Sequence, residues 1–424
     1  MERVRMRGFR RTVKVEDALR AFRRALPDKR LETEIIPVRV ALNRVLAENV
    51  TADRDIPPFD RAAMDGFAVR AEDTFGASQT NPVILKVVGE SKVGATPEVE
   101  VRDGEAVEIM TGAPMPRGAD AVVMVEYTNK LDGGGIEILH PVAPLENVSR
   151  RGEDIKRGET VLRRGTILKP QDLGILASLG RVKVEVYKRP RVAIISTGDE
   201  LVEPGVRVEL GKVVDVNRVI LSAMVEELGG VPIDIGIVRD DPDEIEKAIR
   251  RGLEEADLVI VTGGTSVGRA DMVPEVIDSI GKPGMVVHGV SMRPGTPTGL
   301  AILDGKPVFS LSGYPVAAMM GFNIFVKPVI SWMLGASSLP APTVRARLTR
   351  RVASPPGVLS LVRVKIRKVG GVYMAEPIRS TGSGVISSMT RANGLLVIPE
   401  ESEGVEAGEE VEVTLLRPVE EVQC

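Results

Sequence analysis

The sequence predicts a multi-domain α/β plus β protein, in which a doubly wound α/β domain is combined with an inserted β-rich domain and a small C-terminal β-barrel. At 424 residues the chain is too long for one hydrophobic core. Between residues 188 and 337, apolar strand-like segments alternate with helical patterns, which is typical of a parallel sheet with right-handed crossovers. On both sides of this stretch, short alternating segments are separated by glycine-rich and proline-rich turns, which indicates β-structure.

The first expected element is a helix that opens at Val15, because Ala18, Phe22 and Leu26 are spaced for one apolar face. The helical periodicity extends over residues 14–50. The basic segment before the helix lacks the apolar core of a secretory signal, so we expect a cytoplasmic protein.

Residues 52–144 are expected to form the β-rich domain, in which strands such as Val83–Val88 and Ala121–Val125 are separated by short turns. The sequence then becomes charged and rich in glycine. A helix is expected at Pro170–Leu179, because proline suits the first helical turn. We expect this later stretch to pack against residues 1–50, which makes the β-rich domain an insertion.

The α/β domain is predicted from its alternation of elements. Strands are expected at Arg191–Thr197, Val231–Val238, Asp257–Thr262 and Lys306–Leu311. Helices are expected at Asp215–Leu228 and after Asp241-Pro242, where the apolar positions that face the sheet are Ile245, Ala248, Ile249 and Leu253. These strands and helices together favour a parallel, doubly wound sheet.

The stretch Tyr314–Leu334 is long and apolar enough to be tested as a membrane-spanning helix. It contains Asn323 and the pair Lys327-Pro328, and it follows a strand and a tight turn. A buried helix of the α/β domain is therefore favoured over a membrane span.

After Pro340 the sequence predicts short strands and no long helix, which favours a small β-barrel. The expected strands are Arg345–Thr349, Leu359–Ile366, Leu395–Ile398 and Glu410–Leu415. The domain boundaries that follow are 1–51 with 145–187 for a discontinuous linking domain, 52–144 for the inserted domain, 188–337 for the α/β domain and 338–424 for the barrel.

Composition narrows the classes of function. The formal net charge of −3 gives no basic excess to hold nucleic acid. The only cysteine is Cys424, which excludes an intramolecular disulfide and a thiolate cluster and favours a reducing compartment. With two histidines, acid–base or metal chemistry should fall on carboxylates, lysines and hydroxyls, which favours Mg²⁺ over zinc. Few glutamines beside many Arg, Glu and Pro residues indicate a thermophilic source.

Three predicted strands run into turns of small, hydroxyl-bearing residues: STGDEL (Ser196–Leu201), TGGTSVGRAD (Thr262–Asp271) and SLSGYP (Ser310–Pro315). Ligands of open α/β sheets bind outside the carboxyl ends of the strands, so the turns predict a site for a phosphate-bearing ligand. Glycines let backbone amides approach an anion, and a helix expected near Met272 adds its positive end. The turns match neither the dinucleotide nor the P-loop spacing, and the alternative is a set of tight structural turns.

The candidate binding residues in these turns are Thr197, Gly198, Gly263, Gly264, Thr265, Ser266, Ser312 and Gly313. Carboxylates at the same edge predict a cation site, because Asp199 and Glu200 are adjacent and their repulsion needs a cation or hydrogen-bond donors. A solvated acidic turn is the alternative. Asp240 follows a further strand, and Asp271 is either a metal or hydroxyl ligand or an N-cap.

Two motifs lie further upstream. Asp65-Gly66 stands among apolar residues within IPPFDRAAMDGFAV (Ile56–Val69), where an ordinary turn is the alternative reading. The segment IMTGAPMPRGADAVVMVE (Ile109–Glu126) again shows a strand, a Thr-Gly turn and a strand.

Six motifs occur along the chain in one order: PPFDRAAMDGFAV, IMTGAPMPRGADAVVMVE, RRGEDIKRG, STGDEL, GGTSVGRAD and SGYPVAA. In this order, and over nearly the whole chain, the sequence resembles the molybdopterin molybdenumtransferases, the MoeA family that includes the E domain of gephyrin. The resemblance implies an elongated homodimer with four domains per chain, in which the linking domain serves dimerisation and the α/β domain binds molybdopterin and is similar to that of molybdopterin adenylyltransferases.

The resemblance also implies a transferase of molybdenum cofactor biosynthesis that inserts molybdate or tungstate into adenylylated molybdopterin, uses Mg²⁺ and releases AMP. It implies a molybdopterin adenylyltransferase as upstream partner, and no nucleic acid or membrane. By motif position, the implied catalytic residues are Asp65, Thr111, Asp154, Glu200, Asp240 and Asp271, of which the last three are the implied metal ligands. Arg293 joins the implied binding residues.

Two motifs depart from the family pattern. Met292–Pro297 reads MRPGTP where bacterial members have a lysine-rich stretch resembling KPGKP, and SGYP stands in place of PGNP. Arg293 can replace the charge of a lysine, but its planar fork binds oxyanions differently, and Thr296 carries no charge. The choice between molybdate and tungstate stays open, as does the alternative of a non-catalytic or specificity-shifted paralogue that acts as a molybdopterin-binding scaffold.

Overall fold

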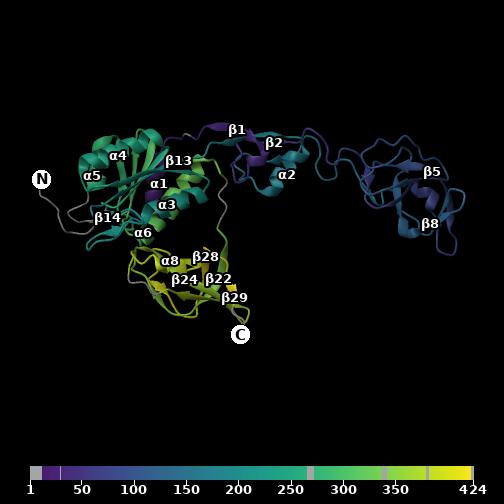
Figure 1. The fold of residues 1–424 in the computed structure, drawn as a ribbon. Helices are drawn as coiled ribbons and strands as arrows, with labels where there is room; N and C mark the ends of the chain where they lie inside the picture. Colours follow the sequence, from purple (N-terminus) through teal and green to yellow (C-terminus); the bar gives the residue numbers. More distant parts are fainter. Residues whose placement is uncertain (1–11, 29, 265–271, 337–340, 379–381, 422–424) are drawn as a thin grey trace. The chain divides into compact units, whose positions relative to one another are not determined.

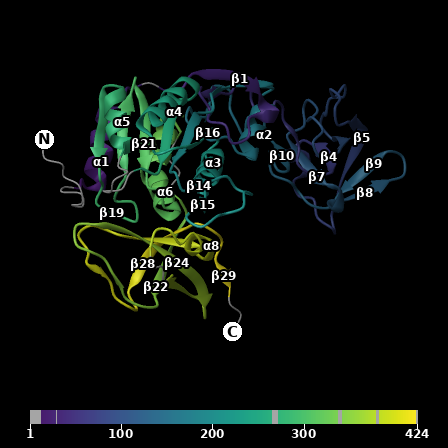
Figure 2. The same ribbon diagram turned by 60° about the vertical axis from the view of Figure 1, so that its left-hand side comes forward.

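The computed structural model describes residues 12–28, 30–264, 272–336, 341–378 and 382–421. They form two compact units, which Figures 1 and 2 show as ribbons. The first unit comprises Met1–Glu34, Asn43–Ala47 and Val186–Cys424, and the second comprises Ile35–Leu42 and Glu48–Glu185. The finer division into four domains stays a prediction.

The first unit contains a six-stranded sheet. Its strands, in spatial order, are β16 (Val231–Val238), β13 (Arg191–Thr197), β17 (Leu258–Thr262), β21 (Lys306–Leu311), β20 (Gly299–Leu303) and β18 (Pro283–His288). The pairings from β16 to β21 are parallel, whereas β20 is antiparallel to both of its neighbours. The sheet is therefore mixed: the four strands predicted from the sequence are parallel, as expected, and the unpredicted strand β20 alone is reversed.

The reversal of β20 follows from its connection to β21. Only Asp304 and Gly305 separate the two strands, and both have positive φ angles, 51° and 74°. Two such residues close a tight hairpin, which joins antiparallel neighbours, whereas a parallel pair needs a longer crossover.

Helices cover both faces of this sheet. One face packs against α4 (Pro242–Glu255) and α5 (Met272–Ile280) through a buried cluster that includes Ala193, Ile195 and Ile249. On the other face, α3 (Asn217–Glu227) contacts β13 and β16, and α1 (Val15–Ala25) places Phe22 against Phe309 of β21 at 5.4 Å between ring centroids. The doubly wound arrangement is thus confirmed.

The apolar stretch after β21 forms one continuous helical rod. It begins as α6 (Pro315–Gly321), widens to a π-helical turn at Phe322–Val326 and continues as α7 (Lys327–Met333). Pro328 has no N–H, and its ring would clash with the carbonyl four residues before it, which accounts for the wider turn. Of the described helices, this 19-residue rod alone is long and apolar enough to cross a membrane, and 61% of its most apolar 18-residue window is buried. The expected buried helix of the α/β domain is therefore found.

The C-terminal part of the first unit is a closed five-stranded β-barrel, as predicted. Its strands are β24 (Leu359–Val369), β25 (Val372–Pro377), β22 (Thr343–Leu348), β28 (Glu410–Leu415) and β26 (Gly394–Ile398), and β26 pairs back onto β24. The short strands β19 (Met292–Arg293) and β29 (Glu420–Glu421) flank β24, and α8 (Ser387–Arg391) is the helix of this part. The β19–β24 pairing joins the barrel to the α/β domain.

The second unit contains a six-stranded β-sheet. In spatial order its strands are β7 (Ala121–Met124), β4 (Gly66–Val69), β6 (Glu105–Ile109), β5 (Val83–Ser91), β9 (Gly135–Ile138) and β8 (Thr128–Leu131). Two further pairs, β2 (Val50–Thr51) with β11 (Thr160–Leu162) and β3 (Arg61–Ala62) with β10 (Val148–Ser149), bring the later stretch back to the earlier one. Helix α2 is found at Pro170–Ser178, as expected.

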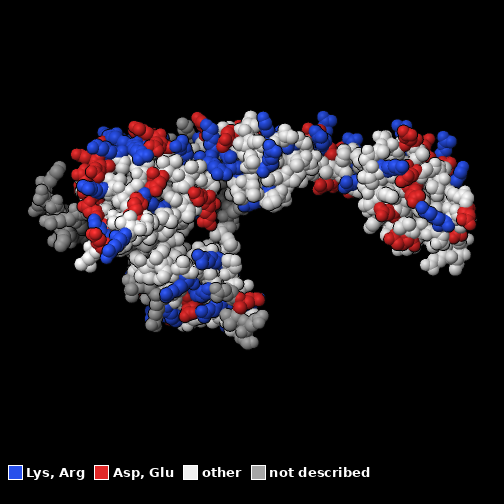
Figure 3. All heavy atoms as spheres, in the orientation of Figure 1, with Lys and Arg blue, Asp and Glu red and all other residues white. Residues whose placement is uncertain are grey.

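The helical periodicity expected over residues 14–50 ends at Ala25. Beyond it lies the strand β1 (Thr33–Pro37), which pairs with β12 (Lys183–Tyr187). The extended β1 is consistent with its content of β-branched residues and proline. On the face drawn in Figure 3, basic and acidic side chains are intermixed over both units.

Candidate functional site

The carboxyl ends of β13, β17 and β21 meet at one edge of the sheet, as the sequence predicted. The hydroxyls of Ser196 and Thr262 share a hydrogen bond of 3.1 Å between the tips of β13 and β17. The backbone N–H of Gly263 donates to the carbonyl of Leu311, at 3.2 Å, at the end of β21. These bonds fix the points from which the three turns start.

Gly263 allows the first two turns to approach each other. Its φ angle is +94°, and a Cβ at this position would lie 2.9 Å from the hydroxyl oxygen of Thr197 and closer still to its carbonyl oxygen. Both the angle and the contact exclude a larger residue without movement of the backbone. The close approach therefore requires glycine.

A cavity of about 660 Å³ opens at these turns. This volume lies within the ~300–1,000 Å³ that is usual for small-molecule sites. The structure brings together here eight of the residues predicted from the sequence: Thr197, Gly198, Glu200, Asp240, Gly263, Gly264, Ser312 and Gly313. The remaining predicted residues of these loops, Thr265, Ser266 and Asp271, lie outside the described residues.

The start of α3 forms a further wall of this cavity, which the sequence reasoning missed. The buried Asp215 accepts hydrogen bonds from the backbone N–H groups of Asn217 and Arg218, at 3.0 and 3.4 Å. The side-chain amide of Asn217 donates to the carbonyl of Gly313, at 2.8 Å. The N-terminus of α3 therefore supports the turn after β21. The signal in the sequence was the Asp-Val-Asn with which the predicted helix opens.

Arg218 holds this wall in place. Its side chain is 8% exposed, and the guanidinium bonds the carboxylates of Asp215, Asp234 and Glu203, at 2.6, 2.6 and 2.5 Å. Burial acts to lower the pKa of Arg218, but the hydrogen bonds to the three carboxylates outweigh it and raise the pKa above its ordinary value. The guanidinium stays charged and ties α3 to β16 and to the segment after β14 (Leu201–Val202).

Asp240 is a carboxylate of the cavity whose surroundings shift its pKa. Burial raises its pKa above the ordinary 3.8, the backbone N–H of Asp199 acts to lower it, and the negative charges of Asp199 and Glu200 raise it further. Its Oδ1 atom is buried and has no hydrogen-bond partner within the described part of the chain. A carboxylate so placed is suited to a cation, which would offset both the burial and the repulsion.

The residues present fit Mg²⁺ as far as they are described. Glu200 and Asp240 line the same cavity, and Mg²⁺ is commonly held by one or two carboxylates together with phosphate oxygens and water. Among the described residues there is no group of three or more His, Cys, Asp or Glu placed to hold a metal. The third predicted ligand, Asp271, is not among them.

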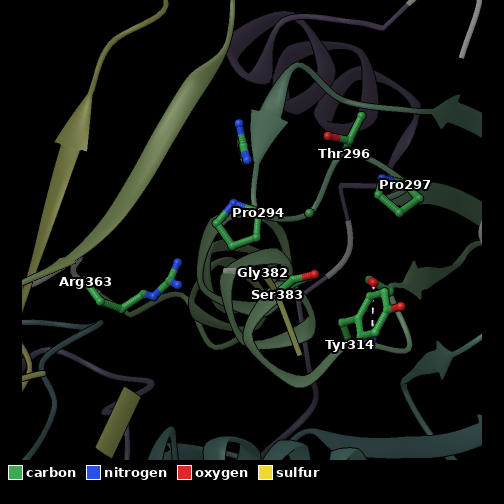
Figure 4. A pocket seen from close by; sticks show the side chains of 11 residues that line it. Pro294, Thr296, Pro297, Tyr314, Arg363, Gly382 and Ser383 are labelled. Carbon is green, nitrogen blue, oxygen red and sulfur yellow. Dashed lines mark hydrogen bonds between the residues drawn. The ribbon is translucent and has the colours of Figure 1, made fainter. Parts of the chain in front are cut away.

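A second cavity, of about 380 Å³, adjoins the first and shares Pro297, Ser312 and Tyr314 with it. It contains Arg293, which the sequence predicted, and Arg363 of the barrel strand β24, which the sequence reasoning missed. In Figure 4, Arg363 and Tyr314 lie on opposite sides of this pocket. Two guanidinium groups beside the hydroxyls of Ser312 and Ser383 make a cavity suited to an oxyanion.

Arg363 is buried, with 8% of its surface exposed. Burial lowers its pKa below the ordinary value of an arginine. Its Nε donates to the hydroxyl of Ser388 at 3.3 Å, which positions the guanidinium. Thr296, at the rim, donates its hydroxyl proton to the Met292 carbonyl at 2.8 Å and brings no charge to the pocket.

The second unit carries the other predicted residues. Asp65, which precedes β4, accepts hydrogen bonds from the backbone N–H and the hydroxyl of Thr111, each at 2.7 Å. The bond from the Thr111 backbone and then that from its hydroxyl lower the pKa of Asp65. Asp154 is exposed, and its backbone N–H donates to the Ile56 carbonyl. The structure thus brings Asp65 and Thr111 together and shows no bond between either of them and Asp154 within the described residues.

The sequence matches three family profiles that together span most of the chain. Residues 13–180 match the MoeA N-terminal region (domain I and II), residues 193–332 a probable molybdopterin binding domain, and residues 345–416 the MoeA C-terminal region (domain IV).

Two curated relatives are named molybdopterin molybdenumtransferase. That of Bacillus subtilis is 36% identical over 395 residues, which is 92% of this chain and 91% of the relative, and that of Staphylococcus aureus is 36% identical over 383 residues, or 90% of each. The crystal structure of the molybdopterin biosynthesis moeA protein from Pyrococcus horikoshii OT3 superposes with a TM-score of 0.83 and 40% identity, covering 96% of this chain and all of that one.

Proposed function

The chain belongs to the MoeA family of molybdopterin molybdenumtransferases, and from this premise we propose that it inserts molybdate or tungstate into adenylylated molybdopterin, with Mg²⁺ and with release of AMP. The chain is thus a transferase of molybdenum cofactor biosynthesis. The main support for the proposed substrates and AMP release is the pair of adjoining cavities. One lies at the turns that suit phosphate, and the other contains two arginines.

The larger cavity suits the phosphates of an adenylylated substrate. The described parts of its three turns offer backbone amides and the hydroxyl of Ser312 at the carboxyl edge of the sheet. Release of AMP requires water to attack one phosphorus of the phosphoanhydride. The bond from that phosphorus to the bridging oxygen breaks, and two phosphate monoesters, AMP and molybdopterin, result. Such a reaction depends on positioning and on charge neutralisation rather than on a strong base.

Glu200 and Asp240 are the described residues that would hold Mg²⁺. When bound, the cation supplies positive charge that neutralises the phosphate oxygens as the anhydride breaks. The chain itself contributes the fixed turns, the carboxylates and the wall built by α3. The buried Oδ1 of Asp240 has no hydrogen-bond partner among the described residues, so this oxygen is free to bind a cation.

The smaller cavity suits the tetrahedral oxyanion. Arg293 and Arg363 provide two planar donor groups, and Ser312 and Ser383 add hydroxyls. Both cavities are bordered by Ser312, so an oxyanion in one lies next to phosphates in the other. This adjacency is what metal insertion into a bound, activated pterin requires.

The test is an AMP-release assay with purified protein, adenylylated molybdopterin, Mg²⁺ and either molybdate or tungstate. We expect AMP release that depends on Mg²⁺ and on one of the two oxyanions. Competition between them at equal concentration identifies the preferred one. Absence of AMP release with both oxyanions would refute the proposal.

We also propose that the chain acts as a homodimer that receives its substrate from a molybdopterin adenylyltransferase. Three apolar side chains of the second unit are widely exposed: Ile35 (70%), Val40 (58%) and Val182 (78%). The backbone N–H of Val38 donates to the carbonyl of Val182, so Val182 lies beside the segment that carries Ile35 and Val40, and we propose that a second copy covers these side chains. Light scattering of the wild type should give twice the chain mass, and Val182→Asp should give a monomer. A wild type that is monomeric at all concentrations would contradict the dimer.

A further inference from the structure

Tyr314 occupies an unusual place, because it borders both cavities. It follows the turn after β21 and is the residue just before α6. Among the described residues that line the two cavities, it is the only aromatic one. Aromatic residues make up just 3% of the whole chain, so an aromatic side chain at this junction is not a consequence of composition.

The backbone of Tyr314 is fixed while its ring is presented outward. Its N–H donates to the hydroxyl of Ser312 at 3.2 Å, and its carbonyl accepts from the N–H of Ala318 at 2.9 Å. The preceding carbonyl of Gly313 is held by Asn217. The Tyr314 side chain is nevertheless 62% exposed. The hydrogen bonds of the backbone therefore fix the position of the ring, and most of the ring surface is not packed against other residues.

Gly384 of the barrel side leaves room for this ring. A Cβ at position 384 would lie 3.2 Å from Cδ1 of Tyr314, which is tighter than an ordinary contact. The edge of the ring thus rests against glycine backbone. Tyr314 lines both the cavity at the turns and the smaller cavity, and Figure 4 shows its ring across the smaller cavity from Arg363.

An exposed aromatic ring beside phosphate-binding turns offers a stacking surface for a flat heterocycle. Adenylylated molybdopterin carries two such heterocycles, adenine and the pterin. The dithiolene that receives the metal belongs to the pterin half of the molecule, so that half must reach the oxyanion cavity. Adenine has no such requirement. The residue that borders both cavities is therefore placed for the pterin.

We propose that Tyr314 is a specificity-determining residue that stacks on the pterin ring of molybdopterin and holds its dithiolene at the mouth of the smaller cavity. This inference rests on the proposed function. The exposed position makes substitution practicable, because truncation of a largely exposed ring leaves no buried void.

The test measures the binding of metal-free molybdopterin and of AMP separately, by calorimetry without oxygen, in the wild type, Tyr314→Asn and Tyr314→Phe. We expect Tyr314→Asn to weaken molybdopterin binding about tenfold, which corresponds to about 1.4 kcal/mol. AMP binding should stay within about twofold. Tyr314→Phe should keep both affinities, because the ring is retained. Phe75→Asn, which removes a 60% exposed ring of the second unit, is the matched control.

Each other outcome has a definite meaning. Unchanged molybdopterin binding in Tyr314→Asn, or a loss of AMP binding instead, would overturn the inference and leave the proposed function intact. An equal loss in Tyr314→Phe would assign the effect to the hydroxyl and overturn stacking. A wild type that binds neither molybdopterin nor AMP would sink the proposed function and the inference with it. A ring-dependent affinity for molybdopterin without any AMP release would refute the proposed reaction alone.

Discussion

Replacement of Arg218 by methionine should destabilise the α/β domain strongly, because it strands a buried carboxylate. Arg218 bonds three carboxylates, and these differ in exposure: Glu203 is 55% exposed, Asp234 60% and Asp215 only 2%. The first two can recover hydration when the guanidinium is removed. Asp215 cannot, so the cost falls mainly on this one side chain.

The magnitude follows from this asymmetry. Removing one partner of a buried ion pair costs about 3–5 kcal/mol. We expect Arg218→Met to lower the free energy of unfolding by about that amount. The double variant Asp215→Asn/Arg218→Met should recover part of the loss, because it removes the stranded charge. The matched control is Arg250→Met, which breaks an exposed pair with Glu246 on α4 and should cost about 0.5 kcal/mol or less.

The single tryptophan of the chain makes the measurement specific. Trp332 lies in α7, and the guanidinium carbons of Arg23 and Arg30 lie 4.1 and 4.8 Å from its ring centroid. Its fluorescence during urea titration therefore reports on the α/β domain and not on the second unit. A loss in Arg218→Met no larger than that in Arg250→Met would refute the reasoning, as would a double variant less stable than the single one.

Three further outcomes are expected. Gly263→Ala should abolish AMP release and lower the unfolding midpoint of the Trp332 signal, because the new Cβ meets Thr197 at a positive φ; normal turnover would contradict the close approach of the two turns. Asp65→Asn should abolish turnover while light scattering shows the dimer intact, and unchanged turnover would remove Asp65 from the catalytic set. Mg²⁺ affinity, measured by calorimetry, should fall as the pH falls through the raised pKa of Asp240, because the proton competes with the cation. Asp240→Asn should remove this pH dependence. Asp243→Asn, which changes an exposed carboxylate, is the control and should keep it.

The strands of the α/β domain could be predicted because their signal is local. Each of β13, β17 and β21 is an apolar run that stops at a small hydroxyl-bearing residue, and the structure places the ends within one residue of the prediction. The turns after them could be assigned to one edge by topology alone. The reversal of β20 was missed because it depends on a two-residue connection, Asp304-Gly305, rather than on the strand residues themselves.

The sequence reasoning missed Arg363 for a different reason. Strand β24 alternates, so that Val364 and Ile366 fill the barrel while Leu361 and Arg363 face outward. From sequence, an arginine on the outer face of a barrel strand is an ordinary solvated residue. Here that face is covered, because Leu361 packs with Val316 and Met320 of α6. The covering buries Arg363 and turns an outward guanidinium into a wall of the oxyanion pocket.

The same packing explains why the site depends on the barrel at all. The turns at the sheet edge supply amides and carboxylates, which suit phosphates and a cation, and their described residues include no arginine or lysine that lines the cavity. The two arginines of the smaller cavity come from β19 and from β24, and these strands pair with one another in parallel register, Arg293 beside Ser360. If the barrel detached from the α/β domain, the smaller cavity would therefore lose Arg363, and Arg293 would lose the strand pairing that positions it. The phosphate edge would keep its turns, so AMP binding should outlast oxyanion binding whenever the contact between α6 and β24 is weakened.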